Sequence, residues 1–169
     1  MSDSPAPFST NLTLGSEAET ANLAQRIAPV LGPGDVLLLE GPIGAGKTHF
    51  ARALIQFLLA RAGTVEDVPS PTFTLVQTYD AGGLEIWHSD LYRLTHVDEL
   101  LELGLEEAFE TAICLVEWPD RLGDLAPPNA LHLRFSQAEA PDARHVCITA
   151  TDPRWHERLS PLLKANAND

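Results

Sequence analysis

The chain has 169 residues, of which 44% are hydrophobic. This composition suits one globular domain with a buried core. The chain carries 24 acidic and 11 basic residues, a formal net charge of −13, which argues against direct binding to a nucleic-acid backbone, because that needs clustered Lys and Arg. No segment approaches the ~18 consecutive apolar residues of a membrane helix. The first residues, MSDSPAPFSTNLTL, lack the basic region and apolar run of a signal peptide.

Two cysteines, Cys114 and Cys147, lie in the apolar segments AICLVEW and HVCITA. We expect both to be buried, reduced thiols, as is usual in proteins of the reducing cytoplasm. The sequence therefore predicts a cytoplasmic protein that does not enter a membrane.

The first half of the chain predicts an edge strand, a helix, a buried strand and a second helix. The apolar patterns place these elements at residues 8–14, 16–31, 36–39 and 47–62. Ser16 and Glu19 fit a capping box at the start of the first helix, and the segment GPGD ends it. The strand at 36–39 is continuously apolar, which is typical of a strand covered on both faces.

The second half is richer in strands. FTLVQTY and LEIWHSDLY flank DAGG and predict a hairpin. HVDELLELGLEEAFE predicts short helices broken at Gly104, and AICLVEW predicts a buried strand that Pro119 ends. NALHLRF and RHVCITA predict two antiparallel strands joined by SQAEAPDA, and PRWHERLSPLLKANAND predicts a short tail helix that frays.

Taken together, these elements predict one α/β domain. Helices lie between some strands and hairpins between others, which indicates a mixed, partly parallel sheet of about seven strands flanked by helices. We expect residues 1–7 and 152–169 to be less ordered than the body, or the latter to form a short helix.

The segment GPIGAGKT, Gly41–Thr48, matches the phosphate-binding pattern G-x-x-x-x-G-K-[ST]. Glycines let such a loop curl until several backbone N–H groups meet one phosphate, and the following helix adds its N-terminal amides and dipole. Lys47 supplies a cation for the outer phosphates, and Thr48 supplies a hydroxyl to Mg²⁺. The motif predicts a P-loop nucleotide site but does not indicate which nucleotide.

Two carboxylates are candidates for completing this site. Asp90 closes the second hairpin strand, and Glu117 closes the most apolar strand after the loop. Ligands gather at the carboxyl ends of parallel strands, where an acidic residue can hold the magnesium shell. The alternative for each is an ordinary strand-end carboxylate that faces water.

The segment PSPTFTL is a further candidate. Two prolines stiffen a loop that delivers Thr72, which would complete a magnesium shell or sense the γ-phosphate, unless the prolines only shape the entry to a strand. His49 and His88 lie near the proposed site, where packing or hydrogen bonding is a commoner role than catalysis. Trp118 adjoins Glu117 and is a cover for the site, a cover for a partner contact, or a plain core residue, which is the commoner role.

Several motifs occur in the order found in the TsaE (YjeE) family, and the sequence resembles that family from about residue 10 to about residue 150. They are LEGPIGAGKTHFARAL, SPTFTLVQTY, HSDLYRL, LLELGLEEAF and ICLVEWPDRLGDLAPPNALHL. The P-loop is shared by many families, whereas SPTFTLV, DLYRL and VEWPDRL in this order are much more specific.

The resemblance implies a small bacterial P-loop ATPase of tRNA threonylcarbamoyladenosine synthesis. Such a protein binds ATP with Mg²⁺ and hydrolyses it slowly when alone. It works with TsaD and TsaB, which transfer the threonylcarbamoyl group to tRNA, and its own ATP cycle looks like a reset step. Direct contact with nucleic acid is not expected.

The resemblance also implies roles for individual residues. The phosphate loop comprises Gly41, Pro42, Ile43, Gly44, Ala45, Gly46, Lys47 and Thr48, followed by His49. Thr48 and Glu117 look like magnesium ligands, and Asp90 looks like an acid close to both the metal and the attacking water. Either Asp90 or Glu117 would position that water. Thr72 lies in the nucleotide-responsive loop, and Glu17 lies where the family approaches adenine.

The sequence departs from the family pattern at a few positions. Pro42 and Ile43 stand where an acidic residue and a leucine are common, and Ser89 stands where a larger residue is usual. Pro42 donates no N–H, so one contact to phosphate or partner is lost.

Two other functions remain open from the residues. A small-molecule kinase would usually carry an arginine-rich lid, whereas Arg52, Arg61, Arg93 and Arg121 are scattered. A binding module would hold a nucleotide without hydrolysing it.

Overall fold

The computed structural model describes residues 8–71 and 74–167. The strands are β1 Phe8–Leu14, β2 Val36–Glu40, β3 Val76–Ala81, β4 Leu84–Asp90, β5 Ile113–Glu117, β6 Leu131–Gln137 and β7 Arg144–Ala150. The α-helices are α1 Glu17–Ile27, α2 Lys47–Arg61, α3 Asp98–Leu103, α4 Leu105–Thr111 and α5 Pro153–Ala167. Two 3-10 helices are η1 Ala28–Val30 and η2 Pro119–Leu125.

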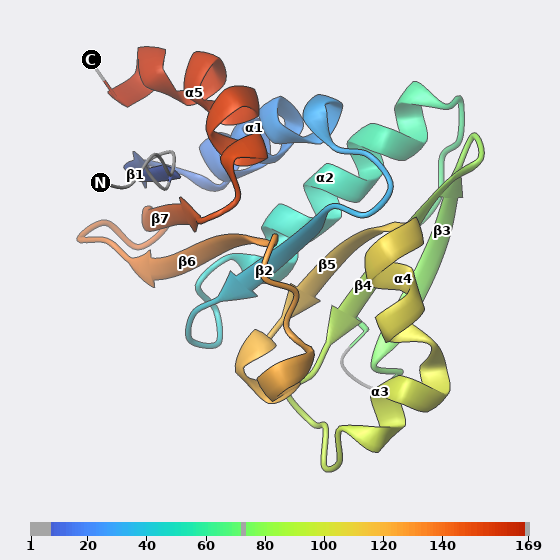
Figure 1. Cartoon of the computed structure of the whole chain (residues 1–169). Coiled ribbons are helices and arrows are strands. Elements are labelled where there is room, and N and C mark those ends of the chain that lie inside the picture. Colours follow the sequence, from blue (N-terminus) through green and yellow to red (C-terminus); the bar gives the residue numbers. More distant parts are fainter. Residues whose placement is uncertain (1–7, 72–73, 168–169) are drawn as a thin grey trace, which may run out of the picture.

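The strands form one mixed sheet of seven strands in the order β1-β7-β6-β2-β5-β4-β3 (Figure 1). β2 lies at the centre and runs parallel to β5 and β6, and β4 runs parallel to β5. The remaining pairs, β1–β7, β6–β7 and β3–β4, are antiparallel. The predicted mixed sheet is confirmed, and its parallel centre brings the carboxyl ends of β2, β4 and β5 to one edge.

Helices cover the sheet centre from both sides, which explains the continuous apolar strands. One core packs α1, α2 and α5 against side chains such as Leu37, Leu39 and Leu115. The other packs α3 and α4 against the alternate side chains Val36 and Leu38. Figure 1 shows α1, α2 and α5 on one side of the sheet and α3 and α4 on the other. The residues of β2 and β5 before their final glutamates are therefore all apolar, because both faces of these strands are buried.

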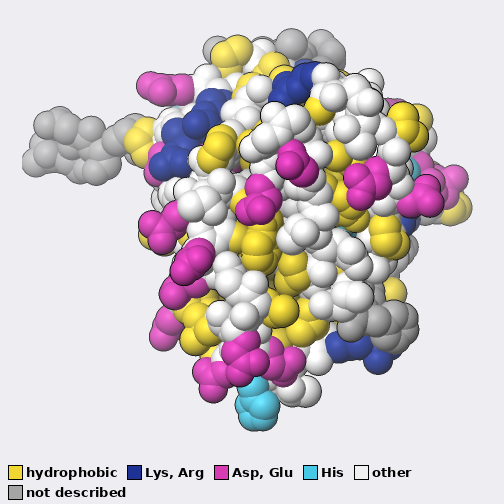
Figure 2. Space-filling view, turned by 90° about the vertical axis from the view of Figure 1, so that its right-hand side faces the viewer, with side chains coloured by type: hydrophobic (Ala, Val, Ile, Leu, Met, Phe, Trp, Pro, Cys, Tyr) yellow, Lys and Arg dark blue, Asp and Glu magenta, His cyan; other side chains and the backbone are white. Residues whose placement is uncertain are grey.

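The face that carries α3 and α4 is strongly acidic. In Figure 2 acidic side chains far outnumber basic ones on the side of the molecule that lies to the right in Figure 1. The exposed residues Glu102, Glu106 and Glu107 belong to these two helices. This face is consistent with the expectation that the protein does not bind a nucleic-acid backbone directly.

Two predicted element boundaries are wrong, each for a local reason. The first α-helix ends at Ile27 and not near residue 31, because Pro29 has no N–H to continue it and the chain tightens into η1. The hairpin turn comprises only Gly82 and Gly83, with φ of 65° and 93°, so Asp80 pairs within β3 and is not part of the loop. Two consecutive residues with positive φ match the twist of the flanking strands.

Half of the predicted capping box is present at the start of α1. The Ser16 hydroxyl oxygen accepts a hydrogen bond of 3.2 Å from the amide of Glu19. The return bond, in which the amide of Ser16 would donate to the Glu19 carboxylate, does not form among the described residues. The helix still begins where predicted, because one satisfied amide is enough to mark the cap.

The carboxyl-terminal helix does not fray as predicted over its first three turns. Trp155, Leu159 and Leu163 are buried in the core shared with α1 and α2. The Trp155 Nε1–H also donates a hydrogen bond of 2.7 Å to the carbonyl oxygen of Asn129. α5 is therefore part of the packed domain and not a loose tail.

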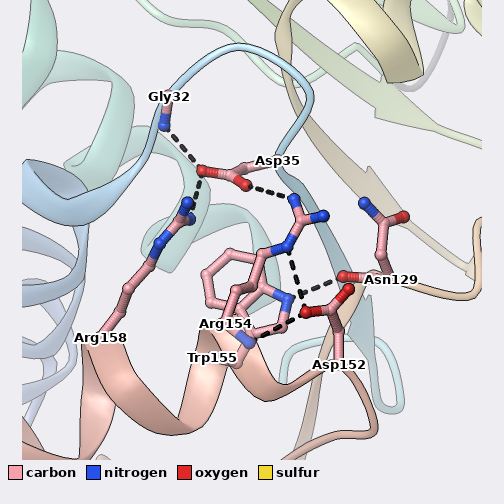
Figure 3. A network of polar contacts seen from close by, with 7 residues as sticks. All are labelled: Gly32, Asp35, Asn129, Asp152, Arg154, Trp155 and Arg158. Atoms are coloured by element: carbon pink, nitrogen blue, oxygen red, sulfur yellow. Dashed lines mark hydrogen bonds and ion pairs between the residues drawn. The ribbon is translucent and has the colours of Figure 1, made fainter.

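A buried aspartate fastens α5 to the loop before β2 (Figure 3). The Asp35 carboxylate, 2% exposed, accepts hydrogen bonds from Arg158 at 2.7 Å and Arg154 at 3.4 Å. It also accepts a bond of 2.7 Å from the amide of Gly32. One carboxylate thus ends the turn after η1 and holds the first turns of α5.

Replacing Asp35 with alanine is expected to lower the free energy of unfolding by about 2 kcal/mol. The substitution removes the carboxylate and its three hydrogen bonds. The two arginines are partly exposed and can be hydrated instead, so the loss of stability is smaller than for a fully buried ion pair. Urea unfolding measures this, with Asp124→Ala on an exposed residue as the control. Equal stability of the two variants would contradict the fastening role.

The two cysteines differ in their surroundings. Cys114 is buried, and burial followed by the charge of Glu85 raises the pKa of its thiol to about 12. Cys147 is only partly buried, contrary to expectation, because it lies on the face of β7 opposite the core. Both are free thiols, as predicted.

Candidate phosphate-binding site at the strand ends

The glycine-rich loop between β2 and α2 is curled tightly against the end of β6. Gly41 has a φ of 144°, and a Cβ there would lie 2.6 Å from the carbonyl oxygen of Phe135, so only glycine fits. Gly46 has a φ of 102° where it caps the start of α2. The first amides of α2 have no partner within the helix, and they carry the positive end of its dipole. This geometry is that of an anion-binding loop.

Lys47 lies at the base of this loop. Its Nζ donates a hydrogen bond of 2.5 Å to the carbonyl oxygen of Gly41 and lies 3.5 Å from the centroid of the Trp118 ring. Burial lowers the pKa of Lys47, and the negative charges of Glu117 and Asp90 oppose this shift. The carboxylates therefore favour the charged ammonium in a position that would otherwise disfavour it.

Trp118 covers the lysine and is not an ordinary core residue. Its backbone adopts a left-handed conformation, with φ of 60° and ψ of 53°, and its amide donates to the carbonyl oxygen of Leu39 at 3.3 Å. This turn directs the ring over Lys47, where the ring of Tyr92 lies against it at 4.9 Å between centroids. Of the interpretations from the sequence, the position of the ring over Lys47 supports a cover for the site.

The two strand-end carboxylates lie side by side next to the loop. Asp90 and Glu117 are register partners on β4 and β5 and are 4% and 1% exposed, so the alternative that they face water is wrong. The Thr48 hydroxyl donates a hydrogen bond of 2.7 Å to Glu117 Oε1. The other oxygen of Glu117 contacts His88 Nε2 at 2.7 Å. Asp90 Oδ1 accepts from the amide of Tyr92 at 3.0 Å.

A pocket of about 540 Å³ opens above these residues. It runs from the start of α1 and the β6–β7 loop to the segments that follow β4 and β5. Its lining comprises Glu17, Thr20, Ile43, Gly44, Gly46, Lys47, Thr48, His49, Arg52, Asp90, Tyr92, Arg93, Glu117, Trp118, Asp142 and Arg144.

Most of the residues predicted for the site line this pocket. Glu17 and His49 lie together at its α1 end, where His49 Nε2 is 3.0 Å from the carbonyl oxygen of Glu17. Gly41, Pro42 and Ala45 belong to the loop but are outside the lining of the pocket. Thr72 falls outside the described residues, so its role stays a prediction.

Arg144 is a contributor to the pocket that no pattern in the sequence indicates. Its guanidinium donates a hydrogen bond of 3.0 Å to the carbonyl oxygen of Gly44. It also donates bonds of 2.8 Å to the carbonyl oxygens of Pro141 and Ala143. Arg144 thereby joins the β6–β7 loop to the phosphate loop. It was missed because it carries no motif and lies 100 positions from Gly44.

Comparisons with known proteins show the family to which this fold belongs. The family model for the threonylcarbamoyl adenosine biosynthesis protein TsaE matches residues 14–146. The chain belongs to the TsaE family. The TsaE protein of Rickettsia conorii is 37% identical over 151 residues, covering 89% of this chain and 83% of that protein. The Bacillus subtilis TsaE is 38% identical, covering 89% and 90%.

A solved structure of a TsaE relative shows the same architecture. The crystal structure of Bacillus subtilis YdiB superimposes with a TM-score of 0.78 at 30% identity and covers 96% of this chain and 99% of that one. The resemblance found in the sequence and the P-loop α/β fold are therefore confirmed. The family membership also confirms a role in tRNA threonylcarbamoyladenosine biosynthesis.

The positions that depart from the TsaE family pattern leave the core of the site in place. The Pro42 carbonyl oxygen accepts a hydrogen bond of 3.1 Å from the amide of Ala45, and Ile43 is 70% exposed at the rim. Ser89 is fully buried.

Within residues 8–71 and 74–167, no helix has the length and apolar character needed to cross a membrane.

Proposed function

We propose that this chain binds ATP with Mg²⁺ and hydrolyses it, slowly alone and faster with TsaD and TsaB. In this proposal it does not transfer the threonylcarbamoyl group itself. The observation that carries the proposal is the contact between Thr48 and Glu117 beside Lys47, at the point where a glycine loop meets the carboxyl ends of parallel strands.

The phosphates would lie over the loop and the start of α2. Free amides of the loop and the first helical turn would bind the phosphate oxygens, and Lys47 would leave Gly41 and Trp118 to contact the outer phosphates. Trp118, at the end of β5, would remain beside the outer phosphates and limit the access of water to them.

The donor set at the centre of the pocket fits Mg²⁺. Thr48 Oγ1 and Glu117 Oε1 are hard oxygen donors 2.7 Å apart, and these two residues would hold the ion, with Asp90 beside them. No group of three or more His, Cys, Asp or Glu among the described residues could hold a metal alone, as expected where phosphate oxygens and water complete the shell. When bound, the ion neutralises charge on the transferring phosphate.

The two carboxylates would have different roles, one in holding the metal ion and one in orienting the attacking water. Both oxygens of Glu117 already accept hydrogen bonds, from Thr48 and His88, which favours a holding role for Glu117. Asp90 would then orient the attacking water from the neighbouring strand end.

The adenine and ribose would lie at the opposite end of the pocket. Glu17, Thr20, His49, Asp142 and Arg144 line that end. Their carboxylate, hydroxyl and backbone groups offer acceptors to the exocyclic amine of adenine. This arrangement supports the approach of adenine to the start of α1.

Replacing Arg144 with glutamine is expected to weaken ADP binding about tenfold, equivalent to ~1.4 kcal/mol. The variant removes a cation from the pocket and the charged donor that steadies Gly44. Calorimetry measures the affinity, and Arg134→Gln is the matched control, because the Arg134 side chain is 71% exposed outside the pocket. If both variants bind ADP with equal affinity, Arg144 does not contribute to nucleotide binding.

The alternative as a small-molecule kinase is less well supported. The arginines of the pocket come from separate elements, with Arg52 on α2, Arg93 after β4 and Arg144 on β7. They do not form one lid segment. Arg52 is already engaged with the carbonyl oxygen of Val68 at 2.9 Å.

The fate of the γ-phosphate of labelled ATP tests the proposal. Release as inorganic phosphate without an added acceptor, and faster with the TsaD–TsaB pair, is the expected result. Transfer to a small acceptor would support the kinase, and bound ATP that is never cleaved would support a binding module.

A further inference from the structure

A second buried residue stands behind the proposed metal ligand. His88 is completely buried on β4, and its Nε2 lies 2.7 Å from Glu117 Oε2. An ionised carboxylate only accepts hydrogen bonds, so His88 Nε2 carries the hydrogen and donates it. The histidine does not line the pocket, and it reaches the site only through Glu117.

The register of the sheet explains how the two side chains meet. In the parallel pair β4–β5, His88 lies opposite Leu115 and Asp90 lies opposite Glu117. Alternate residues of a strand share a face, so His88 and Glu117 lie diagonally on the face that packs against α2. The contact is therefore fixed by backbone pairing and not by a flexible loop.

The contact is not an efficient way to stabilise a core. His88 Nδ1 has no hydrogen-bond partner among the described residues, and a buried polar atom without a partner destabilises a fold. Compared with apolar packing, a buried hydrogen bond to a charged group such as the His88–Glu117 contact contributes little to the net free energy of unfolding. The geometry therefore points to a role in holding Glu117.

We propose that His88 is a positioning residue for magnesium binding. Its Nε2–H holds Glu117 Oε2, which fixes the carboxylate so that Oε1 faces Thr48 and the metal position. Residues that orient a metal ligand in this way commonly change metal affinity 10- to 100-fold. The inference rests on the proposed function, because it requires that Thr48 and Glu117 hold Mg²⁺ beside a nucleotide.

The test compares ADP affinity by calorimetry with Mg²⁺ and with EDTA, and the ratio of the two is the magnesium effect. His88→Leu removes the donor. His88→Gln replaces it, because the glutamine amide nitrogen occupies nearly the position of His Nε2. His88→Asn is polar but too short to reach Glu117. Ile86→Val, two residues earlier on the same face of β4, is the packing control.

We expect His88→Leu and His88→Asn to lower the magnesium effect about tenfold while ADP affinity in EDTA stays within about twofold. His88→Gln and Ile86→Val are expected to keep the magnesium effect of the unmodified protein. In the background of Glu117→Gln, His88→Leu should add nothing further, because the two residues act through one contact.

Other outcomes overturn the inference. A magnesium effect that is unchanged in His88→Leu, or lost equally in His88→Gln, would show that the hydrogen bond does not position the ligand. If His88→Leu does not fold, the comparison of His88→Gln with His88→Asn decides in the same way. Absence of any magnesium effect in the unmodified protein would overturn the proposed function itself, which keeps the two failures distinct.

Discussion

Lys47→Ala is expected to abolish measurable ATP binding, a loss of at least about 100-fold, or ~3 kcal/mol. Lys47 is the cation at the base of the loop, and each charged hydrogen bond that it would give to an outer phosphate contributes more than a neutral one. Calorimetry measures the affinity. Lys164→Ala is the matched control, because Lys164 is the other lysine of the chain and lies in α5.

The stability of Lys47→Ala distinguishes a specific loss of ATP binding from a failure to fold. Burial lowers the pKa of Lys47. A base whose pKa is lower in the folded state than in the unfolded chain reduces the free energy of unfolding at every pH where the unfolded chain is protonated. The loss of this unfavourable charge offsets part of the loss of the contacts with Gly41 and Trp118, so we expect Lys47→Ala to stay folded near neutral pH, which urea unfolding measures. Unchanged ATP affinity in a folded variant would show that the phosphates bind elsewhere.

Glu117→Gln is expected to retain nucleotide binding in EDTA but to lose Mg²⁺-dependent hydrolysis by about 100-fold or more. The amide keeps the shape and one acceptor oxygen for Thr48, but it removes the charge that would hold the metal. Phosphate release in the presence of the TsaD–TsaB pair is the measurement. Glu110→Gln, on an exposed residue of α4, is the control.

The outcome for Glu117 also tests the division of roles between the carboxylates. Asp90→Asn should slow hydrolysis while leaving the magnesium effect on ADP binding intact. Hydrolysis at the unmodified rate in Glu117→Gln would mean that the metal ligand has been misplaced.

The centre of the fold could be predicted because local patterns determine it. The continuous apolar residues of β2 and β5 indicate burial on both faces, and the glycines and Lys47 place a phosphate loop between a strand and a helix. The ends of those strands then identify Asp90 and Glu117. Each of these inferences uses only neighbouring residues and the rule that parallel strands end together.

The remainder depends on contacts between distant segments. Arg144 meets Gly44 and Arg158 meets Asp35 across separations of 100 and 123 residues, and no local pattern indicates either pairing. The sequence predicts packing or hydrogen bonding for His88, but the partner of its hydrogen bond, Glu117, depends on the register between β4 and β5. The role of Trp118 likewise depends on its left-handed backbone, which a tryptophan in sequence does not reveal.

The rate of phosphate release from ATP with Mg²⁺, measured with the protein alone and then with increasing TsaD–TsaB pair from the same organism, tests the central claim most directly. Slow release that rises and saturates as the pair is added is the predicted result, and it would make the loop a partner-dependent ATPase site. Release that is indifferent to the pair, or that appears only with an added small acceptor, would contradict it.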